Sequence, residues 1–158
     1  MSRTHAGHPA SLRHDWADHA VSRILDAGHR SGAARRRVID GLASHDCCLS
    51  AQELHDHIGR SGRPVGIASV YRVIELLESL RLVQRFDFDG GVSRYEPALP
   101  GGEHHHHLLC LGCGEVLPFH DDALEAAIHA TAKRASYEIE DHDVVLRGRC
   151  PGCRGNSY

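Results

Sequence analysis

The most distinctive chemistry in this sequence is its supply of metal ligands. Fifteen histidines and six cysteines occur among 158 residues, whereas aromatic residues make up only 5%. Thiolate and imidazole groups suit zinc and related transition metals better than hard cations such as Mg²⁺. The composition therefore points to metal binding before any motif is considered.

Four of the cysteines form two C-x-x-C pairs, Cys110 with Cys113 and Cys150 with Cys153. The two-residue spacer lets both thiolates of a pair turn around one ion, and two pairs complete the tetrahedral coordination of zinc. Because four thiolates leave no open position, we expect a structural Zn²⁺ that ties the chain end to an earlier hairpin. The alternative is a set of redox-active dithiols.

Four consecutive histidines, His104 to His107, precede the first C-x-x-C pair. Side chains alternate between the two faces of a β-strand. In a strand, His105 and His107 therefore point one way, and His104 and His106 point the other way. This run of four histidines can thus supply ligands to two different metal sites. The alternative is that the run is a solvated polar strand or the remnant of a tag.

The first half of the chain has the pattern of a winged helix. Asp89-Gly90-Gly91 forms a hairpin turn between strands expected at Leu82–Phe88 and Val92–Glu96. Ser50 as N-cap with Glu53 three residues later predicts a capping box. Helical apolar spacing predicts four helices before the hairpin: from Trp16 to Gly28, over Ala33–Ser44, from Ser50 to Ile58, and from Gly66 or Ser69 to Leu80.

The second half is expected to form a small sheet with one helix. Strands are predicted at His104–Leu111, Glu115–Phe119, Tyr137–Glu140 and Val144–Gly148. Asp121 or Asp122 caps the helix, whose predicted inner face is Leu124, Ala127, Ile128 and Thr131. The fold class is therefore α+β, with a flexible tail at 1–14, a winged-helix domain at 15–97, a hinge at 98–103, and a small α/β metal-binding domain at 104–158.

Charge is distributed unevenly between these halves. Residues 30–86 carry nine arginines against six acids, whereas residues 91–158 carry six basic residues against ten acids. The basic first half suits a polyanion such as DNA. No apolar segment is long enough to span a membrane and the N-terminus lacks a signal-peptide core, so we expect a cytoplasmic protein with no membrane partner.

Several short segments combine with the metal ligands into one specific pattern. They are Ser50-Ala51-Gln52-Glu53-Leu54, Gly66-Ile67-Ala68-Ser69-Val70-Tyr71-Arg72-Val73, the turn at residues 89–91, Tyr95-Glu96, the four histidines and both C-x-x-C pairs. Over roughly residues 28–153 the sequence resembles the ferric uptake regulator (Fur) family of bacterial metalloregulators. The resemblance implies a homodimeric repressor that binds an A·T-rich inverted-repeat DNA operator with a metal, Fe²⁺ or Zn²⁺, as co-repressor. It also implies that the winged helix at 15–97 is the DNA-binding domain and that residues 104–158 form the dimerisation domain.

The resemblance also implies functional residues. A sensory metal site falls on Cys48, Glu96, His105 and His107, and an additional site on His104, His106, Glu125 and His142. DNA contacts fall on Arg30 and Arg35, and on Ser69, Tyr71 and Arg72, which face outward because Val70, Val73 and Ile74 are needed inward.

Some residues depart from the family pattern. Cys48 stands where iron-type members usually have His, and a thiolate softens the site toward zinc. Pro118 stands where the peroxide-sensing branch has a carboxylate, and Ala98 lies near the place of a cysteine found in zinc-sensing relatives. The identity of the regulatory metal therefore stays open, and Cys47 is expected to pack as a small apolar residue.

Two other function classes compete with a regulator. A metallohydrolase would use an open His/Glu site as a Lewis acid, but the sequence offers no evident nucleophile set. A zinc buffer or metallochaperone would explain the ligands but not the ordered helices and wing. Specific DNA binding separates all three.

Overall fold

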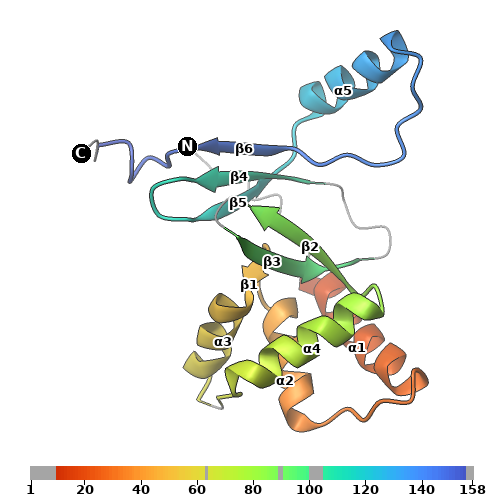
Figure 1. Cartoon of the computed structure of the whole chain (residues 1–158), viewed down its shortest axis with the longest axis vertical. Coiled ribbons are helices and arrows are strands. Elements are labelled where there is room, and N and C mark those ends of the chain that lie inside the picture. The colour runs from red at the N-terminus through yellow and green to blue at the C-terminus, as the bar shows by residue number, and fades with distance from the viewer. Residues whose placement is uncertain (1–9, 63, 89–90, 100–104, 156–158) are drawn as a thin grey trace. The chain divides into compact units, whose positions relative to one another are not determined.

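The computed structural model describes residues 10–62, 64–88, 91–99 and 105–155. The chain divides into two compact units, an N-terminal unit that ends before the four histidines and a C-terminal unit that follows. Both are drawn in Figure 1 and each is described by itself. Among the described residues, no helix is long and apolar enough to cross a membrane.

Over its described residues, the N-terminal unit contains four helices and a three-stranded sheet, which Figure 1 draws. The strands are antiparallel in the order β1-β3-β2, and β1 is a two-residue strand that the sequence pattern did not predict. The elements are α1 (Ala10–Asp26), α2 (Ala33–Ala43), β1 (Leu49–Ser50), α3 (Ala51–Arg60), α4 (Ile67–Ser79), β2 (Val83–Phe88) and β3 (Val92–Pro97).

One apolar core joins these helices to the sheet. The Trp16 side chain is 1% exposed and its Nε1–H donates to the carbonyl of Leu82 at 2.8 Å, which ties α1 to the start of β2. The helix α1 begins at Ala10, so residues 10–14, assigned to a tail from the sequence pattern, are helical. The largest fully buried side chains are Trp16, Ile24, Ile39, Leu42, Leu54, Ile74 and Leu77.

The predicted starts of α3 and α4 are confirmed by their caps, whereas α3 continues two residues past its predicted end at Ile58. Ser50 accepts the N–H of Glu53 at 3.2 Å, while a Glu53 carboxylate oxygen accepts the N–H of Ser50 at 2.8 Å. This is the predicted capping box. Of the two predicted starts of α4, Gly66 is the N-cap. The predicted hairpin strands pair as β2 and β3, and residues 89 and 90 of its turn lie outside the described residues.

The described part of the C-terminal unit, from residue 105 to 155, is a three-stranded sheet with one helix. Its elements are β4 (His106–Cys110), β5 (Val116–Phe119), α5 (Asp122–Arg134) and β6 (Val145–Gly148). The central strand β4 pairs antiparallel with β5 and parallel with β6. Asp121, one of the two predicted caps of α5, accepts the N–H of Leu124 at 2.8 Å.

Two predictions for this unit are wrong. Residues 137–140 form no strand, because the chain there ends α5: Ser136 has φ +59°, and the N–H groups of Ser136 and Tyr137 donate to Lys133 and Ala132. This is a Schellman stop, which uses the backbone groups a strand would need. The predicted inner face of α5 is also wrong in part, since Ala127 and Thr131 are exposed while Leu124 and Ile128 are half-buried within the chain.

Candidate metal centres

The two C-x-x-C pairs come together at one end of the small sheet. Cys110 ends β4, and the parallel register pairs it with Gly148 at the end of β6, just before Cys150. The four Sγ atoms all lie within 4.8 Å of one another, with Cys113 and Cys150 3.8 Å apart. The structure therefore forms one cluster of four sulfurs and not two separate dithiols. Tetrahedral zinc prefers such a closed set of four thiolates.

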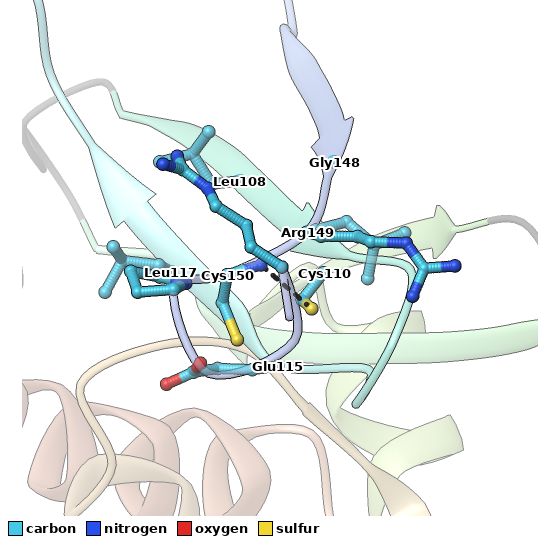
Figure 2. Close-up of a pocket in the computed structure, with 10 residues that line it drawn as sticks. Leu108, Cys110, Glu115, Leu117, Gly148, Arg149 and Cys150 are labelled. Atoms are coloured by element: carbon cyan, nitrogen blue, oxygen red, sulfur yellow. Dashed lines mark hydrogen bonds between the residues drawn. The ribbon is translucent and has the colours of Figure 1, made fainter. Parts of the chain in front are cut away.

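Backbone N–H groups favour one ionised sulfur in this cluster. The N–H of Cys150, drawn as a dashed line in Figure 2, donates to Cys110 Sγ at 3.3 Å, and Gly112 donates at 3.4 Å. These contacts, that of Cys150 foremost, lower the pKa of Cys110 to about 6. Contact with the other sulfurs, Cys150 first, raises the pKa of Cys153 to about 12. Four adjacent thiolates need a cation to coexist, so the donor set fits a divalent metal.

A cavity of about 350 Å³ opens beside Cys110 and Cys150 (Figure 2). Leu108, Leu109 and Leu117 form its apolar wall. Among the residues that line this cavity, Glu115 is the one further titratable side chain beside the cysteines that could bind a metal ion.

A second cluster lies between β4, α5 and the segment before β6. His106 Nε2 is 2.6 Å from one oxygen of Glu125, and His142 Nε2 is 3.0 Å from the other oxygen. The His106 side chain is fully buried, and the three side chains offer ligand atoms within 4.8 Å of one another. Two imidazoles and a carboxylate form a donor set that suits a transition metal. The fourth predicted ligand, His104, lies outside the described residues.

His105 and His107 lie together on the other face of the strand. Their ring centroids are 4.9 Å apart, whereas the intervening His106 faces Glu125 and His142. The strand alternation therefore separates the histidines into two groups, as the sequence pattern indicates.

The other two predicted sensory ligands belong to the N-terminal unit. The pairs Leu49–Tyr95 and Ser50–Arg94 set the β1–β3 register, and continuing this register by one residue would place Cys48, which directly precedes β1, opposite Glu96. Directly opposed residues share one face of an antiparallel pair. Contact with the Cys47 sulfur, then burial, raises the pKa of the Cys48 thiol. The four predicted ligands thus fall on both units, and their joint coordination stays a prediction.

The predicted DNA-contacting residues lie on the solvent side of the winged helix. On α4 the side chains of Val70, Val73 and Ile74 are buried as predicted, while Tyr71 is 50% exposed. Arg72 is exposed, Ser69 is half-buried, Arg30 is exposed between α1 and α2, and Arg35 on α2 donates to the carbonyl of Arg30.

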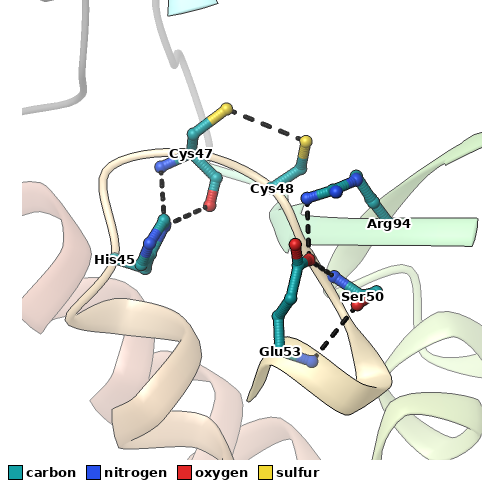
Figure 3. Close-up of polar contacts among 6 residues, drawn as sticks. All are labelled: His45, Cys47, Cys48, Ser50, Glu53 and Arg94. Atoms are coloured by element: carbon teal, nitrogen blue, oxygen red, sulfur yellow. Dashed lines mark hydrogen bonds and ion pairs between the residues drawn. The ribbon is translucent and has the colours of Figure 1, made fainter. Parts of the chain in front are cut away.

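The structure also contains an ion pair that the sequence pattern missed. Arg94 on β3 lies 2.7 Å from Glu53 at the start of α3 (Figure 3). Burial opposes ionisation of Glu53, but the Ser50 and Arg94 contacts outweigh it and hold the pKa of Glu53 below its ordinary value. The two residues are 41 positions apart, so only the β1–β3 pairing brings them together.

Comparison with known proteins decides the family. A profile of the Ferric uptake regulator family matches residues 26–147. The chain belongs to the ferric uptake regulator family. The Fur protein of Legionella pneumophila is 39% identical over 132 residues, covering 83% of this chain and 96% of that protein. The predicted resemblance is therefore confirmed.

Solved Fur structures share the fold. The Vibrio cholerae Fur structure has a TM-score of 0.71 and 34% identity, covering 82% of this chain and 98% of that one. The Helicobacter pylori Fur structure, described as having three functional metal binding sites, has a TM-score of 0.78 and 25% identity, with 92% and 96% covered. The α+β fold class, with an N-terminal DNA-binding and a C-terminal dimerisation domain, is confirmed. As a Fur-family member, the chain is a metal-responsive transcription regulator.

Proposed function

We propose that this Fur-family chain is a homodimeric, cytoplasmic repressor that binds its DNA operator when a regulatory metal is bound. The observation that carries the proposal is the distribution of the predicted sensory ligands. Cys48 directly precedes β1 and Glu96 lies on β3 of the same unit, whereas the rings of His105 and His107 lie together at the start of β4 in the other unit. Ligands supplied by both units make their relative orientation depend on the metal.

In this mechanism, Cys48 and Glu96 hold the same ion as His105 and His107. When the ion is bound, the two units connected by the predicted hinge at residues 98–103 would keep one relative orientation. The two α4 helices of a dimer could then enter successive major grooves. Allosteric couplings of this kind are typically about 1 to 3 kcal/mol, or roughly 5- to 150-fold in affinity. Metal excess then represses, and metal depletion releases the operator.

The other two clusters have separate proposed roles. Cys110, Cys113, Cys150 and Cys153 hold a structural Zn²⁺, which joins the turn after β4 to the turn after β6. His106, Glu125 and His142, with His104 as the fourth ligand, hold an additional ion that attaches α5 to the sheet. Three sites would parallel those described for the Helicobacter pylori protein.

The regulatory ion is Fe²⁺ or Zn²⁺ in this proposal. Glu96, His105 and His107 supply oxygen and nitrogen ligands that suit either ion, whereas the Cys48 thiolate favours zinc. The metal preference therefore depends on the sulfur ligands of the N-terminal unit.

DNA contacts are assigned to the start of α4, to the loop before α2 and to the first turn of α2. Tyr71 and Arg72 are exposed, and Ser69, two residues before Tyr71, is half-buried. Arg30 and Arg35 add positive charge where phosphates would lie. The proposed operator is an A·T-rich inverted repeat, whose symmetry matches a homodimer.

The homodimer is proposed to form through the C-terminal unit. Leu108 is in register with Leu117 on one side and Leu146 on the other, so three leucines cross one face of the sheet. Leu108 is 39% and Leu146 47% exposed, and α5 buries no side chain in the chain. A second copy would cover these apolar surfaces.

Fluorescence anisotropy of labelled DNA from the chain's own promoter tests the proposal, at fixed salt and buffered Fe²⁺, Zn²⁺, Mn²⁺ or Ni²⁺. At least one ion is expected to raise DNA affinity within the 5- to 150-fold range, since typical coupling is about 1 to 3 kcal/mol. Arg72→Ala should weaken binding, while Arg23→Ala on α1 serves as a matched control. If no metal raises the affinity, the co-repressor mechanism is wrong.

A further inference from the structure

Cys48, one of the proposed sensory ligands, is directly preceded in the sequence by a second thiol, Cys47. Their Sγ atoms are 3.7 Å apart and point to the same side of the chain, as the dashed line in Figure 3 shows. This separation is close to the 3.8 Å between Cys113 and Cys150 in the four-cysteine cluster. The N-terminal unit thus contains a pair of sulfurs spaced like two members of that cluster.

The spacing suits one metal ion better than a disulfide. Two sulfurs at about 2.3 Å from a tetrahedral zinc are about 3.8 Å apart. A disulfide would instead need sulfurs at about 2.05 Å and Cα atoms usually 4.4 to 6.8 Å apart. Consecutive Cα atoms are only about 3.8 Å apart, so a bond between neighbours is strained. Chelation needs no such distortion.

The backbone on both sides of the pair is fixed. His45 Nδ1 lies 3.3 Å from the backbone nitrogen of Cys47 and 3.0 Å from its carbonyl oxygen, and it hydrogen-bonds one of these two groups according to the tautomer of the ring. On the other side, Leu49 and Ser50 pair with β3, and Ser50 caps α3. The two thiols are consequently held in place between two anchors, which reduces the entropy lost on binding an ion.

We propose that Cys47 is a second thiolate ligand of the sensory site, so that the two sulfurs of Cys47 and Cys48 bind one zinc-type ion together. This inference rests on the proposed function, and it replaces the expectation that Cys47 only packs as a small apolar residue. Two thiolates on one ion favour zinc over Fe²⁺ and Mn²⁺. The Cys47–Cys48 pair therefore makes this chain a zinc-responsive regulator.

Cobalt provides a direct probe of sulfur ligation, because thiolate bound to Co²⁺ gives a charge-transfer absorption that grows with the number of sulfurs. Co²⁺ is added to the full-length chain with zinc retained in the four-cysteine cluster. The wild type is expected to show the absorption of two thiolates per added ion. Cys47→Ser and Cys48→Ser should each halve it, and the double variant should abolish it.

Zinc competition measures how much each of the two thiolates contributes to the zinc affinity of the sensory site. Each single variant should lose more than about 100-fold in zinc affinity at this site, beyond the roughly 10- to 100-fold typical of outer-shell changes. Cys47→Ala is the packing control: a ligand is lost equally in the Ala and Ser variants, whereas a packing residue tolerates the apolar replacement better. Circular dichroism and retained zinc content verify that each variant is folded.

The outcomes separate this inference from the proposed function. If Cys47→Ser leaves the absorption and zinc affinity unchanged while Cys48→Ser reduces both, Cys47 is no ligand and the proposed sensory site remains. If neither variant changes the cobalt absorption or the zinc affinity, Cys48 is no ligand of the sensory site either. Both proposals are then wrong about their sulfur ligands.

Discussion

At the scale of single residues, Gly112 shows how tightly the four-cysteine cluster is built. A Cβ atom at this position would lie 2.8 Å from Cys153 Cβ and 2.9 Å from Cys153 Sγ. Contacts this short force the neighbouring atoms apart, and both of these atoms belong to a proposed zinc ligand. Glycine is thus required here by the close approach of the two turns and not by its backbone angles.

Gly112→Ala is therefore expected to displace Cys153 and weaken the structural zinc site. Overpacking of this kind costs about 1 to 3 kcal/mol. The measurement is the rate of zinc release to a chromophoric chelator, together with the thermal unfolding midpoint. Gly148→Ala is the control, because nothing lies within 4 Å of its added Cβ. Equal zinc retention in both variants would contradict the assigned role of Gly112.

Much of the site was predictable at this scale, because local spacing determines it. The C-x-x-C spacing predicted the four-sulfur cluster, and strand alternation predicted that His106 would face away from His105 and His107. The proximity of the Cys47 and Cys48 sulfurs was not predictable, since their rotamers depend on anchors such as His45. The Arg94–Glu53 pair needed the β1–β3 pairing and could not be inferred from spacing.

At the scale of elements, α3 is attached to the sheet through its first turn. Glu53 completes the capping box with Ser50 and also pairs with Arg94 on β3. Arg94 is two residues before Glu96, and Ser50 is two residues after Cys48. The start of α3 is thus connected directly to the strand pair that carries two proposed sensory ligands.

Glu53→Gln should destabilise the folded chain by about 0.5 to 1 kcal/mol, a value limited by the partial exposure of the pair. Because the folded-state pKa of Glu53 lies below its ordinary value, this stabilisation is fully present above the unfolded pKa of about 4.3. It is lost as the pH falls through the folded-state pKa. Denaturant unfolding at pH 7 and at decreasing pH measures this, and a difference between the two proteins that persists unchanged at the lowest pH would contradict it.

The element boundaries that sequence predicted best are those with capping residues. Ser50, Asp121 and Gly66 mark the starts of α3, α5 and α4. The false strand after α5 came from apolar residues in a segment whose backbone completes a helix stop at Ser136, which lacks the usual glycine signal. The two-residue strand β1 is too short for any periodicity to show.

At the scale of the whole molecule, exposed leucines in the C-terminal unit indicate a partner surface. Leu146→Glu places a charge in the leucine row of β4, β5 and β6 and should dissociate the proposed dimer. Leu25→Glu on α1, where the native side chain is 52% exposed, is the matched control. Sedimentation equilibrium should show a monomer for the first variant and a dimer for the second. A dimer in both cases would place the interface elsewhere.

The central claim is that the regulatory metal and the operator stabilise the same state of the protein. Such coupling is reciprocal, so DNA must raise metal affinity by the same factor by which metal raises DNA affinity. The decisive measurement is the affinity of the sensory site for its regulatory ion, with the structural zinc in place, in the presence and absence of operator DNA. The account predicts tighter metal binding with DNA by about 5- to 150-fold. An identical metal affinity with and without operator DNA would contradict it.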